Sequence, residues 1–384
     1  MIELATTALL FLSFLAFAAK RGLTYMHVYQ QEEYDSERLL SWIWKNKAFD
    51  KRLSVVVIVV TILSFFIPPV FVNFLIFTAM AFATYREKDP RKDSKKKLVA
   101  TARAKRIFFP AYFLSVLAAT WCFLPVTPMP WLWILNIHLI PFMILFVNMM
   151  LAPFEEMNQK KFWNEAHNKV LDYQPTVIGI TGSFGKTSVK HILGHILKTQ
   201  APTLVTPGSV NTPMGISRIL REQLEPEHKY LIVEMGAYGR GSIDRLCRLT
   251  PPDFGIITSI GHAHYERFKS LETVAETKYE LAEAVVGRGG QVVVHERTLR
   301  FDYTRAMKEQ NENHFIVCGE SADVDKSKQA DKSYLKKGDL EIHKIIQGGK
   351  GLEVRFTWKN VTYNVEVPLF GIHHGHNIAL AFVT

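Results

Sequence analysis

The sequence predicts two parts, an α-helical transmembrane bundle followed by an α/β domain with a mainly parallel sheet and a small antiparallel meander. Residues 1–152 contain nearly all the long apolar runs, and they carry 17 Lys and Arg against 9 Asp and Glu side chains. From residue 176, short β-rich runs alternate with helical stretches, which is typical of a parallel sheet. After residue 337, strand patterns follow one another without helices between them. The length of 384 residues suits two or three domains.

The apolar runs of the first part predict about five membrane spans, because a helix of roughly 20 apolar residues crosses the hydrocarbon core. No charge lies between Glu3 and Lys20, and no basic region precedes this run, so an uncleaved anchor is favoured over a secretory signal. The 33 uncharged residues 53–85 contain Pro68-Pro69 and predict a tight or shallow hairpin. Two further spans are predicted at 107–126 and 131–152.

The distribution of basic residues predicts the orientation of this bundle. Segment 20–52 carries 7 Lys and Arg, and segment 86–106 carries 10. Short loops rich in Lys and Arg remain in the cytosol. Both segments can be cytosolic only if 53–85 goes out and returns, which places the N-terminus outside and everything after Ala152 in the cytosol. The basic loops would also be attracted to the anionic lipids of a bilayer.

Two other classes of protein are disfavoured by the composition. The basic segments have no interleaved aromatic residues, so nucleic-acid binding is not expected. The cysteines Cys122, Cys247 and Cys318 are far apart and form no CxxC pair, which argues against a zinc site or a disulfide framework. A reducing compartment fits this pattern.

The second part contains six β-rich runs that predict the parallel sheet and three that predict the meander. The predicted strands are 176–181, 203–206, 229–235, 254–260, 291–295 and 314–318, followed by DLEIHKII, LEVRFTW and TYNVEVPLF after residue 337.

The strongest motif is the segment GITGSFGKTS at 179–188, which directly follows the first predicted strand and precedes a helical stretch. Gly182 and Gly185 would let backbone amides curl around phosphate oxygens, and the helix N-terminus adds its positive dipole end. Lys186 would reach the β- and γ-phosphates, and the hydroxyl of Thr187 would bind Mg²⁺. The alternative is a glycine turn followed by an incidental Lys-Thr pair. The motif therefore predicts that the α/β domain is of the P-loop type.

The short form TGSxGKTS differs from a standard Walker A loop and resembles the ATP loop of the Mur ligase and folylpolyglutamate synthase superfamily. No NKxD motif follows, so a GTPase fits poorly. Further stretches in the same order resemble the branch of Mur ligases that adds D-alanyl-D-alanine. These are TPGSVNTPMGISRIL, YLIVEMGAYGRGSIDRL, PPDFGIITSIGHAHYERFKSLETVAETKYELAEAV, FIVCGESADV and VPLFGIHHGHNIALA. The resemblance covers about 175–384.

The resemblance implies roles for individual residues. Glu234, at the end of a strand, corresponds to a Mg²⁺ ligand, and His264 to a histidine that contacts a second metal ion. Lys278 corresponds to a lysine that carries a carbamate in relatives, although the same spacing also makes ordinary ion pairs on a helix surface. Asn211 lies in the substrate-side loop, and Asn377 corresponds to an asparagine near the adenine. The implied nucleotide-binding residues are Gly182, Ser183, Gly185, Lys186, Thr187, Ser188 and Asn377. The implied metal ligands are Thr187, Glu234, His264 and Lys278. The implied catalytic residues are Lys186, Lys278 and His264.

The implied function is that of an ATP-dependent carboxylate–amine ligase with two Mg²⁺ ions. A substrate carboxylate attacks the γ-phosphorus of ATP, and an amine then displaces phosphate from the acyl phosphate to leave an amide. In relatives the carboxylate belongs to a muramoyl-peptide precursor and the amine to D-alanyl-D-alanine. The expected setting is the cytosolic side of the bacterial cytoplasmic (inner) membrane, in peptidoglycan synthesis, where other cell-wall synthesis proteins are possible partners.

The sequence also departs from the family pattern. Relatives carry a soluble N-terminal domain that binds the UDP-sugar, where this chain has its apolar bundle. His374 replaces the first asparagine of the H-N-x-x-N element, and Thr212 stands at the second position of the substrate loop. The expected organisation is a membrane domain at 1–152, a linker at 153–174, a central ATP-binding domain at 175–371 and the start of a hinge at 372–384. The C-terminal domain of relatives is expected either to be lost by truncation or to be supplied in trans.

Two other functions remain open at this point. A ligase similar to poly-γ-glutamate synthase would also combine a membrane segment with this ATP loop. A membrane scaffold that only senses the nucleotide is the third hypothesis.

Overall fold

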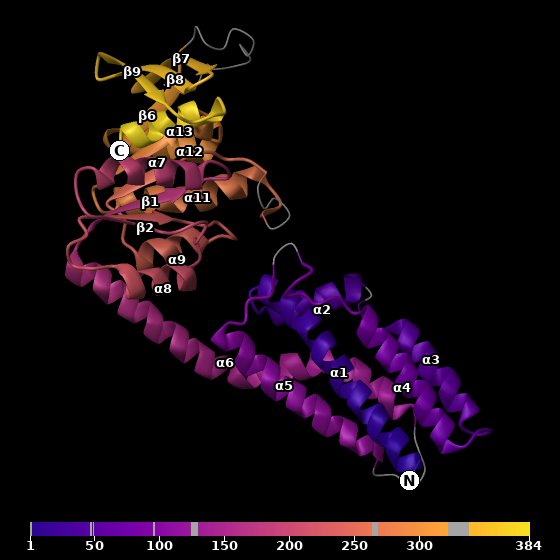
Figure 1. Ribbon diagram of the computed structural model, residues 1–384. Helices are drawn as coiled ribbons and strands as arrows, with labels where there is room; N and C mark the ends of the chain where they lie inside the picture. Colours follow the sequence, from indigo (N-terminus) through magenta and orange to yellow (C-terminus); the bar gives the residue numbers. More distant parts are fainter. Residues whose placement is uncertain are drawn as a thin grey trace. The chain divides into compact units, whose positions relative to one another are not determined.

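The computed structural model divides the chain into two compact units, Met1–Met157 and Asn158–Thr384 (Figure 1). It describes residues 2–46, 48, 50–94, 97–123, 130–262, 268–321 and 338–384.

The first unit consists of helices that bury one shared apolar core. Helix α1 packs against α4 and α5, and α3 packs against α4. Phe14 and Phe17 of α1, Met80 of α4 and Ile107 of α5 are fully buried in this core. The helices are α1 (Ile2–Gln31), α2 (Ser36–Lys45), α3 (Lys51–Leu63), α4 (Pro69–Arg86), α5 (Ala102–Thr120) and α6 (Leu132–Tyr173).

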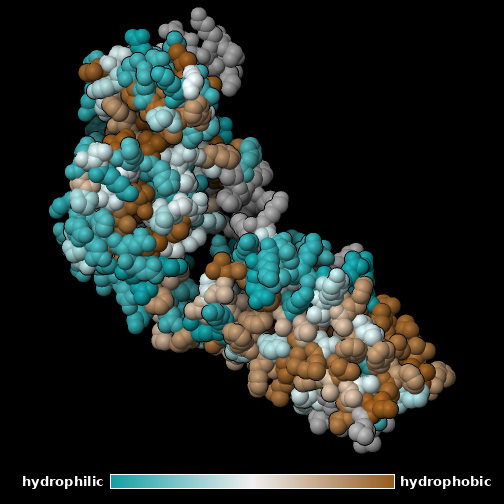
Figure 2. Space-filling model, viewed as in Figure 1, coloured by the Kyte–Doolittle hydropathy of each residue, from teal (hydrophilic) through white to brown (hydrophobic). Residues whose placement is uncertain are grey.

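Within the described residues, three helices are long and apolar enough to cross a membrane, namely α1, α4 and α6. The segment predicted as a hairpin, 53–85, contains the helices α3 and α4. Helix α3 ends at Leu63 and α4 begins at Pro69. Helix α3 has 13 residues, about 20 Å at 1.5 Å per residue, which is shorter than a hydrocarbon core of about 30 Å. Large apolar side chains such as Ile58, Phe74 and Phe113 point outward from this unit, and Figure 2 shows hydrophobic residues over much of its surface. The number of spans stays a prediction.

Helix α1 continues well beyond the charged residues at which its apolar run ends. Lys20 Nζ donates to the carbonyl oxygen of Thr84 at 3.0 Å, and Arg21 forms an ion pair with Glu87 at 3.1 Å. Thr24 donates to the same carboxylate at 2.6 Å. The charges therefore have partners on α4 and in the residue that follows it, so they do not end the helix. Segment 20–52, which the sequence predicted only as a basic loop, contains the end of α1 and the whole of α2.

The second unit is built on a nine-stranded sheet in the order β2-β3-β1-β4-β5-β6-β7-β8-β9. All neighbours from β2 to β7 are parallel, and β7, β8 and β9 are antiparallel to one another. The mainly parallel sheet and the small meander that the sequence predicted are thus confirmed. The strands are β1 (Thr176–Thr181), β2 (Thr203–Val205), β3 (Tyr230–Glu234), β4 (Phe254–Ile257), β5 (Gln291–His295), β6 (Phe315–Glu320), β7 (Leu340–Gly348), β8 (Gly351–Trp358) and β9 (Val361–Val367).

Alternating side chains of the parallel strands enter two cores on opposite faces of the sheet. On β3, Leu231 and Val233 belong to one core and Ile232 to the other, as the period of two in a strand requires. Helix α7 packs against α13 and closes the face that contains Ile232 (Figure 1). Helix α11 contributes Leu281 to the opposite core. The helices are α7 (Lys186–Lys198), α8 (Pro213–Gln223), α9 (Ser242–Leu249), α11 (Leu271–Val286), α12 (Asp302–Gln310) and α13 (His373–Phe382), with a short 3₁₀ segment η2 (Glu296–Arg300).

Two segments expected to lie outside the central domain are helical in the structure. Residues 153–174, expected as a linker, continue α6 as far as Tyr173, and Ala166 and Val170 are buried in the core of the α/β unit. Residues 372–384, expected to begin a hinge, form α13, whose Ile378 is buried against the sheet. Residues 158–174 and 372–384 are therefore part of the packed fold of this unit.

Candidate functional site

The glycine loop lies between β1 and α7, as predicted, and its backbone requires glycine. Gly182 has a φ of +153° and Gly185 a φ of +85°, both in the region that L side chains avoid. A Cβ atom at position 182 would lie 1.9 Å from Thr258 Oγ1. A Cβ atom at position 185 would lie 2.7 Å from Asn377 Oδ1. The loop is therefore closely bounded on two sides, and Asn377 of α13 is brought next to it.

Residues that follow β4 hold the loop in its curved shape. The amide of Ser183 donates to the carbonyl oxygen of Ser259 at 2.8 Å, and the amide of Phe184 donates to Ser259 Oγ at 2.9 Å. Ser183 Oγ donates to the carbonyl oxygen of Gly261 at 3.0 Å. The first amides of α7 belong to Lys186, Thr187 and Ser188. No preceding helical turn supplies carbonyl oxygens to accept their hydrogen bonds. This helix N-terminus is suited to an anionic group.

Lys186 lies at the first position of α7 and its side chain folds back over the loop. Its Nζ donates to the carbonyl oxygen of Gly182 at 2.6 Å. Burial lowers the pKa of Lys186, and the nearby carboxylate of Glu234 opposes that shift. A phosphate group at the helix N-terminus could take the place of the Gly182 carbonyl as the partner of this ammonium.

Glu234 ends β3 at the same edge of the sheet and is 1% exposed. Thr187 Oγ1 donates to its Oε2 at 2.9 Å, and Asn211 Nδ2 donates to its Oε1 at 3.1 Å. Lys190 Nζ, which is fully buried, forms an ion pair with Oε2 at 3.0 Å. The predicted residues Thr187, Asn211 and Glu234 are thus brought together. Asn211, predicted to face the substrate, also accepts a hydrogen bond from the hydroxyl of Tyr238 at 2.8 Å.

The sequence reasoning missed Lys190. Its Nζ donates both to Glu234 and to the carbonyl oxygen of Gly208, so it joins α7 to β3 and to the loop after β2. The sequence could have indicated Lys190 through its position, because a residue four positions after Lys186 lies on the same face of the helix.

Lys278 lies on α11 and is 4% exposed. Burial, together with the charge of Lys186, lowers its pKa from 10.5 to about 7. Among the described residues, no hydrogen bond or ion pair to the side-chain Nζ of Lys278 is present. The ordinary surface ion pair that was its alternative reading is wrong, because the side chain is buried. His264 lies outside the described residues.

The oxygen donors at this site fit a magnesium ion. Mg²⁺ prefers oxygen ligands such as carboxylates and hydroxyls. The Thr187 hydroxyl and the Glu234 carboxylate already lie 2.9 Å apart. Within the described ranges, no group of three or more His, Cys, Asp and Glu residues is arranged to hold a metal ion. Burial and the lowered pKa of Lys278 favour its neutral amine, which is the form of lysine that reacts with carbon dioxide.

Replacing Lys278 with methionine is expected to stabilise the chain at pH 7 by on the order of 3 kcal/mol. The folded-state pKa of about 7 is below the value of 10.5 for a solvated lysine. The unfolded chain therefore binds more protons between these two values, and the stability of the wild type should rise as the pH increases through this window. Thermal melting of the purified chain in bicarbonate-free detergent buffer, at pH 7 and pH 9.5, measures the effect. The difference in melting temperature between Lys278→Met and the wild type should be smaller at pH 9.5 than at pH 7.

Lys198→Met is the matched control for this prediction, because Lys198 is an exposed lysine at the other end of α7. It should melt with the wild type at both pH values. If the Lys278→Met protein melted at a lower temperature than the wild type at pH 7, the conclusion that the buried Lys278 amine destabilises the folded chain would be wrong.

A cavity of about 440 Å³ opens next to the loop. Its walls come from the loop, from the residues after β4, from β5 and η2, and from α13. The lining residues are Phe184, Gly185, Thr258, Ser259, Ile260, His295, Arg297, Arg300, His373, His376 and Asn377. Of the predicted site residues, Gly185 and Asn377 lie in this wall. Its histidines and arginines were not predicted.

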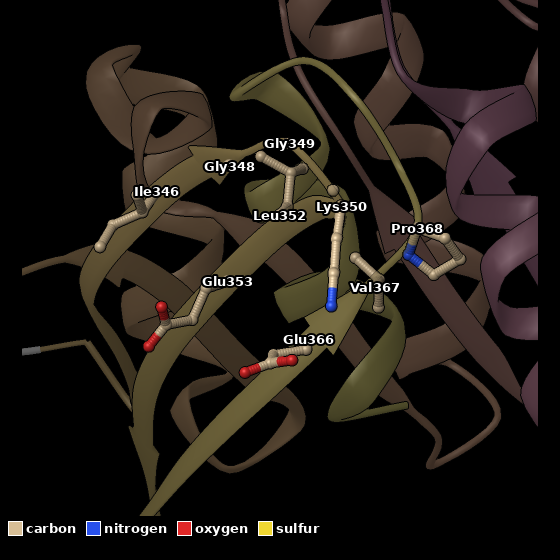
Figure 3. Close-up of a pocket in the computed structure, with 10 residues that line it drawn as sticks. Ile346, Gly348, Gly349, Lys350, Leu352, Glu353, Glu366, Val367 and Pro368 are labelled. Atoms are coloured by element: carbon tan, nitrogen blue, oxygen red, sulfur yellow. The ribbon is translucent and has the colours of Figure 1, made fainter.

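A second cavity, of about 430 Å³, lies at the turn between β7 and β8 and the end of β9 (Figure 3). Lys350, Glu353 and Glu366 are among its lining residues. None of the predicted site residues lines this cavity, so the glycine loop and its surroundings form the candidate site.

A parallel sheet with a strand, a glycine loop and a helix that begins with Lys-Thr defines a P-loop α/β protein. The Mur ligase middle domain model matches residues 180–384, and the chain belongs to the Mur ligase family.

Curated relatives match a shorter segment. A UDP-N-acetylmuramoyl-tripeptide–D-alanyl-D-alanine ligase from Mycobacterium tuberculosis is 40% identical over 119 residues, which are 31% of this chain and 23% of the relative. The ligase of that name from Escherichia coli K12 is 37% identical over 113 residues, which are 29% of this chain and 25% of the relative. The aligned segments thus span about a quarter of these relatives. Among solved structures, MurF from Acinetobacter baumannii is similar with a TM-score of 0.49 and 25% identity, over 58% of this chain and 45% of that one.

Proposed function

We propose that this chain is a membrane-anchored, ATP-dependent carboxylate–amine ligase of cell-wall precursor synthesis. The substrates would be a muramoyl peptide, which supplies the carboxylate, and D-alanyl-D-alanine or a similar amine. The observation that carries the proposal is the cluster of Lys186, Thr187 and Glu234 at the carboxyl edge of the sheet, in a chain that belongs to the Mur ligase family. Ligands of parallel α/β sheets bind at this edge.

The roles of the residues follow from their positions. The first amides of α7 and the ammonium of Lys186 would bind the triphosphate and offset its charge. Thr187 and Glu234 would hold Mg²⁺, and a carbamate on Lys278, with His264, would hold a second ion. Bound magnesium supplies neutralisation of charge on the phosphate oxygens. Asn211 would position Glu234 and the substrate-side loop.

The reaction would proceed in two balanced steps. The substrate carboxylate attacks the γ-phosphorus, which breaks the bond to the β-phosphate oxygen and gives ADP and an acyl phosphate. The amine then attacks the acyl carbon, the bond to phosphate breaks, and the amine loses a proton as the amide forms.

Phosphate release by the purified protein, combined with the C-terminal domain that the family resemblance implies, tests this function. With Mg²⁺ and ATP, release should require both a muramoyl-peptide carboxylate and D-alanyl-D-alanine. Release with glutamate as the amine instead would favour the poly-γ-glutamate type of ligase. Nucleotide binding without release under any of these conditions would favour the nucleotide-sensing scaffold.

The proposed location is the bacterial cytoplasmic membrane, with the α/β unit in the cytosol. It is supported by the three apolar helices and by the Lys- and Arg-rich segments between apolar runs. The natural cysteines Cys122, Cys247 and Cys318 are all buried. A cysteine introduced on the surface should therefore account for nearly all labelling of the folded protein by a maleimide. Lys198→Cys should react with an impermeant maleimide only after intact cells are permeabilised. Labelling of Lys198→Cys in intact cells would contradict a cytosolic α/β unit.

A further inference from the structure

Three side chains from distant parts of the sequence form a hydrogen-bonded network beside the cavity at the glycine loop. His295 ends β5, Glu320 ends β6, and His376 lies in α13. The nitrogens His295 Nε2 and His376 Nδ1 are 3.2 Å apart, and His376 Nε2 lies 3.1 Å from Glu320 Oε1. Arg297 also forms an ion pair with Glu320, at 3.0 Å. Two of the three residues, His295 and His376, line the cavity.

The partners of this network assign every proton in it. The amide of Arg297 donates to His295 Nδ1 at 3.1 Å, so His295 carries its proton on Nε2 and donates it to His376 Nδ1. His376 must then carry its proton on Nε2, and it donates this proton to Glu320. Burial lowers the pKa of His295 to about 3, so this histidine is neutral at physiological pH. The hydrogen bond from His376 lowers the pKa of Glu320 to about 2, so the acceptor is a carboxylate.

Both nitrogens of His376 are therefore occupied within the protein. A histidine in this state cannot offer a hydrogen bond to a ligand. Its ring also cannot rotate without breaking the hydrogen bonds to His295 and Glu320. What it can present to the cavity is its ring face and its carbon edge. The rings of His295 and His376 are 4.9 Å apart at an interplanar angle of 67°, an edge-to-face arrangement that further fixes the second ring.

The cavity directly adjoins the glycine loop, which would hold the phosphates of a bound nucleotide. Its wall includes Gly185, the residue directly before the first turn of α7, and Asn377, which contacts Gly185 closely. Its volume of about 440 Å³ is within the range of pockets that hold small ligands, roughly 300–1,000 Å³. A triphosphate on the amides of α7 would direct its nucleoside toward this wall.

We propose that the network of His295, His376 and Glu320 holds the ring of His376 as a stacking surface for the nucleobase. This inference rests on the proposed binding of ATP at the glycine loop, and it assigns to the nucleobase a specific contact within that site. Aromatic side chains contribute about 1–3 kcal/mol per stacked base, which is roughly 5- to 150-fold in affinity. His295 and Glu320 are positioning residues in this account, and His376 contacts the ligand.

Binding of two ligands by the full purified chain separates this role from a structural one. ATP contains the nucleobase, whereas inorganic tripolyphosphate contains only the phosphates. With Mg²⁺ present, His376→Ala should weaken ATP binding roughly 5- to 150-fold and leave tripolyphosphate binding unchanged. His376→Phe keeps a flat ring without the two hydrogen bonds, so it should retain more of the preference for ATP than His376→Ala does. His195→Ala, an exposed histidine on α7 outside the cavity wall, is the matched control and should bind both ligands as the wild type does.

The possible outcomes distinguish this inference from the proposed function. If the wild type binds neither ligand, nucleotide binding at the loop fails and the inference fails with it. If the wild type binds both ligands and His376→Ala weakens both equally, or neither, only the stacking role is overturned. A loss confined to ATP, with partial rescue in His376→Phe, supports it.

Discussion

Replacing Glu234 with alanine is expected to destabilise the α/β unit by about 3–5 kcal/mol, because the change leaves the buried ammonium of Lys190 without its counter-charge. The carboxylate receives Thr187, Lys190 and Asn211 at 2.9–3.1 Å. Neither side chain of the ion pair is more than 1% exposed, so water cannot replace the lost partner. Amide hydrogen exchange of peptides from β3 and α7 in the full chain measures the effect in this unit directly.

Two further variants show whether the ion pair causes this loss. Replacing both Lys190 and Glu234 with methionine should destabilise the unit less than Glu234→Ala does, because no unpaired charge remains. Glu222→Ala breaks the exposed pair of Arg218 and Glu222, whose side chains are 72% and 51% exposed. Such pairs contribute about 0–1 kcal/mol. The buried ion pair would not have the role given to it here if Glu234→Ala were as mild as Glu222→Ala.

Replacing Lys186 with alanine is expected to lower the affinity for Mg²⁺-ATP by at least about 30-fold and to abolish ATP turnover. Removing one partner of a hydrogen-bonded charge pair costs about 2–5 kcal/mol of binding free energy. In the unliganded chain, Lys186 Nζ donates to the carbonyl oxygen of Gly182, and burial already disfavours its charge. The substitution should therefore leave the melting temperature nearly unchanged while binding is lost. Calorimetric titration with ATP and Mg²⁺ measures the affinity.

Lys198→Ala provides the control for Lys186→Ala, because Lys198 is an exposed lysine at the other end of the same helix. Its affinity for ATP should equal that of the wild type. If Lys186→Ala bound ATP as tightly as Lys198→Ala, the assigned role of Lys186 would be wrong.

Much of the fold could be predicted because the signals are local. The β-rich runs predicted the sheet, and the glycine loop was placed correctly between a strand and a helix. The end of α1 was missed because an apolar pattern stops at Lys20 and Arg21, whereas the helix depends on Thr84 and Glu87, more than 60 residues away.

The site was predicted in part for the same reason. Lys186 and Thr187 are marked by the loop motif itself, and Glu234 by its strand end. The only local signal for Lys190 is its position four residues after Lys186, and its role depends on a carboxylate 44 residues away. The network of His295, Glu320 and His376 joins three separate elements, and only the order of strands β5 and β6 under α13 brings them together.

The most direct test of phosphate binding by the glycine loop is a structure of this chain with Mg²⁺ and a non-hydrolysable ATP analogue. We expect the β- and γ-phosphates within hydrogen-bond distance of the first amides of α7, with Lys186 Nζ moved from the Gly182 carbonyl onto a phosphate oxygen. We also expect magnesium between the Thr187 hydroxyl and the Glu234 carboxylate. An analogue bound elsewhere, with Lys186 still on the Gly182 carbonyl, would contradict the account.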